Sequence, residues 1–130
     1  MGEDGRRILI VEDDEERCAW FRERLAGILL DVTCDVRVAV RWLEERDYRA
    51  LLLDHDLADE HYFSSEPDDE RTGYAVARWL ADHPTAQRDA LIVVHSLNYA
   101  GASRMLAVLR AAGRDAEHIP FYYLQAGLRF

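Results

Sequence analysis

Three short runs of aliphatic residues constrain the fold of this chain more than any other feature. They span residues 8–11, 51–53 and 91–94, and none of them contains a polar side chain. Strands that are apolar at every position are typical of a parallel sheet whose two faces are both covered. The sequence therefore predicts buried parallel strands, each ending abruptly in polar residues.

Helical periodicity separates these runs. Apolar side chains recur at spacings of three and four in stretches that begin near Cys18 and Val36, and the second stretch ends near residue 46. A third helix is predicted over residues 73–82, and a fourth begins at Asn98 or Ser103 and ends at Gly113. The apolar stripe of the first helix is expected to comprise Cys18, Phe21, Leu25 and Ile28.

Two further strands and one long loop complete the pattern. We expect a short strand near residues 32–34 and a last strand over residues 119–124. Residues 57–72 are rich in Asp, Glu, Ser and Pro and read as a functional or mobile loop. The alternation predicts one α/β domain over residues 1–130, with a five-stranded parallel sheet and helices on both faces. Only six residues follow the last predicted strand, so a fifth helix would be truncated or absent.

Composition limits the classes of function. The 25 acidic residues outnumber the 16 basic ones, which argues against general binding of nucleic acid or of an anionic membrane. All 16 basic residues are arginine, so no mechanism can use a lysine ammonium group. Cys18 and Cys34 lack metal-type spacing and are expected to be reduced core thiols. Without an apolar leader or a membrane-length apolar run, the sequence favours a cytoplasmic protein.

Polar side chains follow all three aliphatic runs. In a parallel sheet ligands bind beyond the carboxyl ends of the strands, so these side chains are expected to meet. Crowded carboxylates repel one another, and Mg²⁺ (or Mn²⁺) relieves that repulsion. We expect Asp13 and Asp54 to be direct ligands, Glu12 to act through water, and the backbone near Asp56 to complete the set. The alternative is that the acids only cap helices and end strands. The residues in question are Glu12, Asp13, Asp54, His55, Asp56, His95 and Ser96.

The histidines near these acids are candidates for acid–base chemistry. Imidazole changes protonation near neutral pH, so His55 and His95 could divide the roles of general acid and general base. The alternative for each is a hydrogen-bonded core residue. His61 lies in the polar loop and could reach the site, whereas His83 and His118 read as surface residues.

Two arginines could supply the positive charge that a phosphate needs. A guanidinium group matches the geometry of phosphate oxygens, which makes Arg71 and Arg104 candidate phosphate ligands. For both residues the alternative is a solvated surface position.

A family resemblance rests on these strand ends. Residues 8–14 resemble the first strand and acidic pair of response-regulator receiver domains, and residues 52–54 resemble their third strand, which ends in the phosphoacceptor aspartate. The resemblance implies a flavodoxin-like fold. This chain departs from receivers in three respects. It has no lysine, which receivers carry at the end of the last strand, and it has a pair of histidines, His55 and His95, that ordinary receivers lack. Too few residues follow its last predicted strand for the full fifth helix of receivers.

The resemblance assigns roles to individual residues. It makes Glu12 and Asp13 the Mg²⁺-binding acids and Asp54 the phosphorylatable carboxylate. His95 or Ser96 falls where receivers place a hydroxyl that contacts the phosphoryl group. Counting from the strand start favours His95, while chemistry favours Ser96.

A narrower resemblance is to the cyclic-phosphate-processing receiver domains. It rests on residues 53–57 and 72–74, on His95, Ser96, Asn98, Gly101 and Met105, and on residues 119–121. It implies a role on cyclic phosphate ends, as in RNA repair, with a phosphate-bearing small ligand or an RNA end as partner. Catalytic roles would fall to Asp54, His55, His95 and Ser96, and substrate contacts to Asn98 and Arg104.

Two classes of function therefore compete. The first is a metal-dependent phosphoesterase that acts on a cyclic phosphodiester. The second is a divergent receiver that accepts phosphate on Asp54 from a histidine kinase. A weaker third is a pseudo-receiver that only binds a partner.

The apolar C-terminal residues raise the question of assembly. With little of a fifth helix, they are expected to leave one sheet face uncovered, which favours a homodimer over a tail folded back on the sheet. These residues are Tyr122, Tyr123, Leu124, Leu128 and Phe130.

Overall fold

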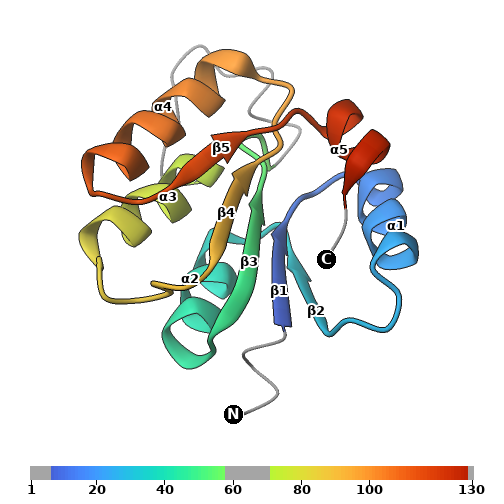
Figure 1. The fold of residues 1–130 in the computed structure, drawn as a ribbon, viewed down its shortest axis with the longest axis horizontal. Coiled ribbons are helices and arrows are strands. Elements are labelled where there is room, and N and C mark those ends of the chain that lie inside the picture. The colour runs from blue at the N-terminus through green and yellow to red at the C-terminus, as the bar shows by residue number, and fades with distance from the viewer. Residues whose placement is uncertain (1–6, 58–70, 129–130) are drawn as a thin grey trace.

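The computed structural model describes residues 7–57 and 71–128. In these ranges five parallel strands form one sheet with the order β2-β1-β3-β4-β5 (Figure 1). This is the strand order of flavodoxin-like folds, as the sequence predicts. The elements are β1 (Arg7–Val11), α1 (Glu15–Arg24), β2 (Leu30–Thr33), α2 (Val36–Glu45), β3 (Tyr48–Leu53), α3 (Gly73–Asp82), β4 (Leu91–Val94), α4 (Tyr99–Ala111), β5 (Ala116–His118) and α5 (Phe121–Gly127).

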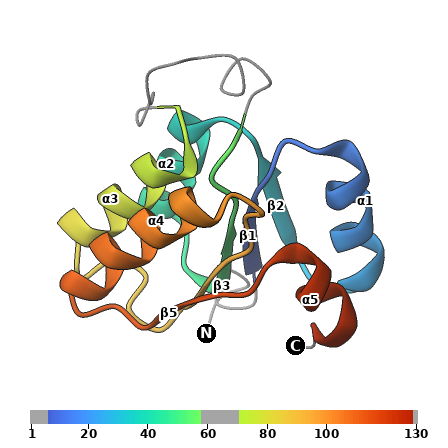
Figure 2. The same ribbon diagram turned by 90° about the horizontal axis from the view of Figure 1, so that it is seen from above.

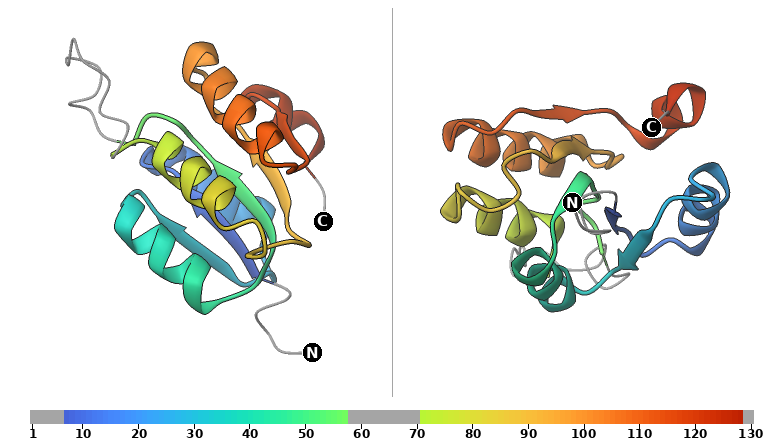
Figure 3. Two further views of the ribbon diagram at one scale, coloured as in Figure 1. Left: turned by 90° about the vertical axis from the view of Figure 1, so that its left-hand side faces the viewer. Right: turned by 60° about the horizontal axis from the view of Figure 1, so that its bottom comes forward.

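Helices cover both faces of the sheet. Helices α1 and α5 lie together on one side, and α2, α3 and α4 lie on the other (Figure 2). Figure 3 shows α2, α3 and α4 lying side by side as one layer. The predicted arrangement of helices on both faces is confirmed.

Strand alternation divides the core into two clusters. In β1, Leu9 and Val11 pack with the α2–α4 layer, while Ile8 and Ile10 pack with α1 and α5. All four side chains are buried. Because neighbouring residues of a strand point to opposite faces, a strand buried on both faces must be apolar throughout. This explains the unbroken aliphatic runs.

Helices α1 to α4 begin at side-chain caps near the carboxyl ends of the strands. Asp14 Oδ1 accepts a hydrogen bond from the backbone N–H of Arg17 at the start of α1. Thr72 caps α3 and Asn98 caps α4 in the same way. Of the two predicted caps, the chain therefore uses Asn98 and not Ser103.

The prediction of a last strand over residues 119–124 is wrong. The strand ends at His118, and Phe121 begins helix α5. Phe121 and Leu124 are buried on one side of this helix, so the segment has a helical period although its residue types favour a strand. Pro120 stands at the N-cap, where its missing N–H leaves no helical hydrogen bond unmade.

Smaller corrections concern α1, β2 and one thiol. Helix α1 ends at Arg24, so Ile28 packs against the core from beyond the helix. The strand expected at 32–34 lies at Leu30–Thr33. Cys18 is buried, but Cys34 is exposed, which contradicts its expected place in the core.

Helix α5 covers the face that was expected to be open. Leu124 and Leu128 are buried beside Phe21 of α1, and Arg24 Nε donates to the Leu128 carbonyl oxygen at 3.0 Å. The expectation that these leucines lack packing partners is wrong, because Leu124 is buried on the seven-residue helix and Leu128 is buried at its C-cap. Tyr122 and Tyr123 are exposed, and Phe130 lies outside the described residues. The homodimer itself stays a prediction.

No helix in the described ranges has both the length and the apolar character needed to cross a membrane.

Candidate functional site

Glu12, Asp54 and His95 occupy equivalent positions on three neighbouring strands. Each is the first residue after its strand, and the last strand residues are paired in register, Val11 with Leu53 and Leu53 with Val94. Val11, Leu53 and Val94 all face the α2–α4 layer. The next residue of each strand therefore turns its side chain to the α1 and α5 side.

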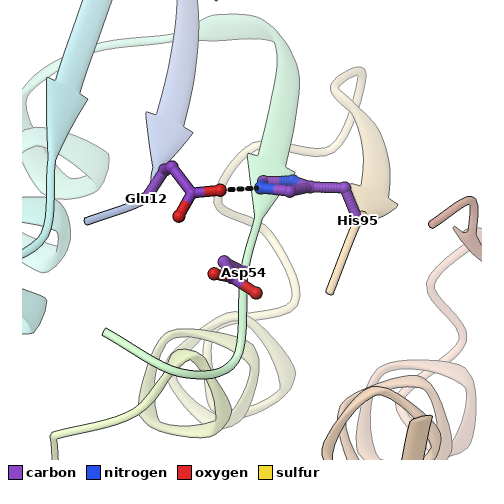
Figure 4. A group of neighbouring side chains, drawn as sticks. All are labelled: Glu12, Asp54 and His95. Atoms are coloured by element: carbon purple, nitrogen blue, oxygen red, sulfur yellow. Dashed lines mark hydrogen bonds and ion pairs between the residues drawn. The ribbon is translucent and has the colours of Figure 1, made fainter. Parts of the chain in front are cut away.

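The backbone hydrogen bonds of the sheet continue one residue beyond the strands and hold the backbones of these three residues side by side. The N–H of Asp54 donates to the Val11 carbonyl oxygen, and the N–H of His95 donates to the Leu53 carbonyl oxygen, both at 2.9 Å. We refer to Glu12, Asp54 and His95 as the strand-end cluster (Figure 4).

The strand-end cluster is compact and buried. One possible ligand atom from each residue lies within 4.8 Å of the others. The exposed fractions of the whole residues are 2% for Glu12, 3% for Asp54 and 1% for His95. His95 Nε2 lies 3.0 Å from Glu12 Oε1. Two carboxylates and an imidazole thus share one water-poor space at the carboxyl edge of the sheet.

The carboxyl groups of Glu12 and Asp54 have very different pKa values. Burial, followed by the negative charge of Glu12, raises the pKa of Asp54 to about 8. Burial also opposes ionisation of Glu12, but hydrogen bonds and positive charge from His95 and Arg17 outweigh it and lower the pKa of Glu12 to about 2. Near neutral pH the negative charge therefore resides on Glu12, while Asp54 tends to hold its proton.

Arg17 of α1 is the cation beside this pair, and sequence reasoning missed it. Its Nε donates to Glu12 Oε1 at 2.9 Å, and its Nη2 lies 3.7 Å from Asp54 Oδ2. The available signal was the cap at Asp14, which starts α1 and so places Arg17 in the first helical turn, next to the strand ends.

One of the two arginines proposed from sequence, Arg104, packs on an aromatic ring. The guanidinium carbon of Arg104 lies 4.5 Å from the ring centroid of Tyr74. Arg71 is exposed. Their contact with phosphate stays a prediction.

Asp13 lies beside the strand-end cluster. Its side chain is half-buried, and its backbone N–H donates to Glu12 Oε2 at 3.0 Å. Burial, together with the charge of Glu12, raises the pKa of the Asp13 carboxyl. Asp13 thus borders the same negative region, and its role as a direct metal ligand stays a prediction.

His55, Asp56 and Asn98 form a second polar group. His55 Nδ1 lies 2.7 Å from Asp56 Oδ1, and Asn98 Nδ2 donates to the same oxygen at 3.2 Å. His55 follows Asp54 and rests against Gly101 of α4, so it is not a member of the strand-end cluster. The structure therefore places the two candidate catalytic histidines in separate groups at the same edge of the sheet.

Two glycines allow close approach within this second group. A Cβ atom on Gly101 would overlap the His55 ring, with Nδ1 at 2.7 Å. A Cβ atom on Gly73 would overlap the Asp54 carbonyl oxygen, and the Gly73 N–H donates to the His55 carbonyl oxygen at 2.8 Å. Both positions require glycine because backbone or ring atoms occupy the space of a side chain.

His95, and not Ser96, belongs to the strand-end cluster. Ser96 is buried, and its Oγ accepts a hydrogen bond from the backbone N–H of Asn98 at 3.0 Å. His83 and His118 have their partners outside the cluster. His83 stacks on Trp79, and His118 Nε2 lies 2.8 Å from the Ser96 carbonyl oxygen. His61 lies outside the described residues.

The donor set fits a divalent cation. Burial and the charge of Glu12 together raise the pKa of Asp54, and an ion between the two carboxylates would offset both effects. Carboxylate oxygens with a half-buried third acid at the border suit Mg²⁺ or Mn²⁺. Asp56 is less suited as a side-chain ligand because His55 and Asn98 already engage its carboxylate.

Sequence comparison identifies a family. A family described as "Cyclic-phosphate processing Receiver domain" matches residues 8–111. The match includes every residue of both polar groups described above. No relative was found among curated proteins.

Solved structures share the fold at low sequence identity. A CheY-like response regulator receiver domain from Methanospirillum hungatei JF-1 has a TM-score of 0.61 at 18% identity, covering 88% of this chain and 81% of that one. The response regulator TrrA from Thermotoga maritima, in complex with Mg²⁺–BeF, has a TM-score of 0.64 at 16% identity, covering 93% and 91%. A response regulator from Burkholderia pseudomallei with a phosphorylated aspartic acid and a calcium ion has a TM-score of 0.64 at 17% identity, covering 95% and 66%.

Proposed function

The chain belongs to the family of cyclic-phosphate processing receiver domains, and on this premise we propose that it opens a cyclic phosphodiester at the strand-end cluster. The substrate class is a 2′,3′-cyclic phosphate on a small nucleotide or an RNA end. The observation that carries the proposal is the convergence of Glu12, Asp54 and His95 within 4.8 Å in a buried space.

The acids account for metal binding in this proposal. Asp13 and Asp54 would hold Mg²⁺ or Mn²⁺ directly, Glu12 through water, and Asp56 through its backbone carbonyl. The ion, when bound, polarises a phosphoryl oxygen and offsets negative charge in the transition state. Burial, followed by the charge of Glu12, raises the pKa of Asp54, and this supports the assignment because a bound cation would favour the ionised carboxylate.

The two histidines divide the proton transfers. Ring opening adds the oxygen of water to phosphorus, breaks the bond to one ribose oxygen, and delivers a proton to that oxygen. Asp56 accepts from His55 Nδ1, so Nε2, which is buried and has no partner among the described residues, is the ring nitrogen left to take a proton from a water that enters the site. His95 would protonate the leaving oxygen from Nε2 in its protonated form, and the contact of Nε2 with Glu12 Oε1 at 3.0 Å would have to open for that transfer.

Asn98, Ser96 and Arg104 have supporting roles. Asn98 caps α4 and contacts Asp56, so it positions the His55 group and borders the substrate space. Ser96 holds the turn that carries Asn98. Arg104 is the more distant substrate contact.

A direct assay tests the proposal. The protein is incubated with Mg²⁺ and a 2′,3′-cyclic nucleotide, and the products are separated to detect a nucleoside monophosphate. Asp54→Asn serves as the matched control because it keeps the side-chain shape and cannot ionise to bind a cation. Absence of any monophosphate with the unaltered protein contradicts a hydrolase.

A second candidate function is phosphoryl acceptance on Asp54 from a histidine kinase. Its specific support is the position of Asp54 at the end of β3 in a receiver fold, together with the phosphorylated aspartic acid in the Burkholderia pseudomallei structure. The absence of lysine from the whole sequence weighs against it. Incubation with acetyl phosphate, followed by mass measurement for an adduct of about 80 Da on Asp54, tests this alternative.

A further inference from the structure

Arg17 is more exposed than the two carboxylates of the strand-end cluster that it contacts. Its side chain is 22% exposed, whereas those of Glu12 and Asp54 are 0% and 5% exposed. The guanidinium carbon also lies 5.9 Å from the ring centroid of Phe121 at the start of α5. Any ion or phosphate that approaches the buried carboxylates from this side meets Arg17 first.

Arg17 contacts the same oxygens that a divalent cation would use. Its Nε and Nη2 donate to the two oxygens of Glu12 at 2.9 and 3.3 Å, and Nη2 lies 3.7 Å from Asp54 Oδ2. A guanidinium group carries one positive charge, while a divalent ion carries two in a smaller volume. The two cations therefore compete for one pair of carboxylates, and occupation by one disfavours the other.

We propose that Arg17 is the phosphate-binding cation of this site, and that it becomes available for phosphate when a divalent ion takes over Glu12 and Asp54. This inference rests on the proposed function. Released from Glu12, the guanidinium stays within reach of the site because α1 is fixed at its start by the Asp14 cap. Its planar fork matches two oxygens of a phosphate group.

The sequence leaves this role to an arginine. The chain contains no lysine, so a permanently positive side chain at the phosphate has to be a guanidinium. Arg17 pairs with two buried carboxylates, whereas Arg104 lies over the Tyr74 ring. The cation thus comes from α1 and not from the last strand.

The proposal predicts the direction in which Mg²⁺ affinity and phosphate affinity change when Arg17 is replaced. Replacing Arg17 with an uncharged residue removes a competitor, so Mg²⁺ should bind more tightly. The same replacement removes a phosphate ligand, so phosphate should bind more weakly. In the unaltered protein each ligand should promote binding of the other, because both favour the displaced arginine.

Titration calorimetry with Mg²⁺ tests both effects, first alone and then with inorganic phosphate present. Arg17→Met keeps side-chain length and loses the charge, and Arg22→Met is the matched control on an exposed position of the same helix. We expect Arg17→Met to bind Mg²⁺ about 3–10-fold more tightly and to lose most of a coupling of about fivefold or more with phosphate. Arg22→Met should stay within about twofold of the unaltered protein in both measurements.

The outcomes separate this inference from the proposed function. Unchanged or weaker Mg²⁺ binding by Arg17→Met, relative to Arg22→Met, overturns the competition. Phosphate binding as tight as in the unaltered protein overturns the phosphate role. Absence of Mg²⁺ binding in all three proteins overturns the metal site and with it the proposed function. The expected shifts without hydrolysis of a cyclic nucleotide would leave the role of Arg17 standing and contradict only the activity.

A second variant covers a failure of Arg17→Met to fold. Lysine keeps the charge but cannot bond both Glu12 oxygens through a planar fork. Arg17→Lys should therefore bind Mg²⁺ about twofold more tightly and show reduced coupling to phosphate. Coupling and Mg²⁺ affinity equal to those of the unaltered protein would overturn the proposal.

Discussion

His95 Nε2 lies 3.0 Å from Glu12 Oε1, although 83 positions separate the two residues in the chain. A carboxylate oxygen only accepts, so the Nε2 atom carries the hydrogen. The other ring nitrogen of His95 is buried and has no hydrogen-bond partner in the described part of the chain. The ring centroid lies 5.3 Å from that of Phe21. His95 is thus held between an acid on one side and an apolar ring on the other.

The first prediction concerns His55 and His95 as an acid–base pair. Replacing either with Gln should lower the rate of cyclic-nucleotide hydrolysis by about 10²–10⁴ while Mg²⁺ affinity stays unchanged. The unaltered protein should show a bell-shaped dependence of kcat/KM on pH, and each variant should lose one limb. Steady-state kinetics across pH, with Mg²⁺ titrated separately, provides the measurement.

Gln at position 95 is also the matched structural control. Its amide can donate to Glu12 as the imidazole does, so the fold should survive the exchange. Full activity in both single variants would assign His55 and His95 a structural role only.

Strand positions were predictable where the chain is apolar throughout. The limits of β4 at Leu91–Val94 and of α3 at Gly73–Asp82 are those the sequence predicts. Both limits follow from local signals. An unbroken aliphatic run defines β4, and Pro84 marks the end of α3. The last strand was misplaced because Ile, Phe and Tyr favour strands, while burial of Phe121 and Leu124 on one side of a helix outweighs that preference.

The part of the site that lies at the strand ends could be predicted from the sequence. Glu12, Asp54 and His95 each follow an apolar run directly, so their convergence follows from the parallel sheet. The separation of His55 from this cluster also follows from alternation, since His55 is one residue further than Asp54. The contact of Arg17 could not be read in this way, because it depends on how α1 packs beside the sheet.

The second prediction concerns the charge of Asp54. Its pKa is raised from 3.8 to about 8, so between these values the unfolded chain loses a proton that the folded chain keeps. Stability therefore falls as pH rises from about 4 to 8, because the unfolded state binds fewer protons in this window. Asp54→Asn removes this loss and should be more stable by about 2 kcal/mol at pH 8, with little difference near pH 4.

Urea denaturation at several pH values checks this prediction, with and without Mg²⁺. Glu12 contributes in the opposite direction, since its lowered pKa gives stability above pH 4.5 that is lost as pH falls through about 2. Adding Mg²⁺ should stabilise the unaltered protein and leave Asp54→Asn unaffected. Equal Mg²⁺ affinity in the two proteins would contradict the metal site.

The third prediction concerns assembly. Tyr122 and Tyr123 are 69% and 70% exposed on α5, while Leu124 and Leu128 are buried within the same chain. If a two-fold contact forms, the exposed tyrosines are its apolar residues, and Tyr123→Glu should dissociate it. Light scattering at micromolar concentration measures the mass. A mass near 15.0 kDa for the unaltered protein at every concentration would contradict the dimer.

The fourth prediction concerns the contact between Gly101 and His55. An alanine Cβ at position 101 would overlap the His55 ring, which cannot retreat easily because Asp56 and Asn98 hold it. Gly101→Ala should therefore destabilise the protein by about 1–3 kcal/mol. In a His55→Ala background the obstacle is gone. The same exchange should then stabilise by up to about 1 kcal/mol, since alanine favours a helix over glycine.

Denaturation midpoints of the two single variants and the double variant measure this reversal of sign. Gly127→Ala is the matched control, because Gly127 also lies in a helix and a Cβ there meets nothing within 4 Å. It should be neutral or slightly stabilising in both backgrounds. A destabilisation by Gly101→Ala that persists at full size without the His55 ring would show that another neighbour requires the glycine. The ring of His55 would then not be fixed by its contact with α4.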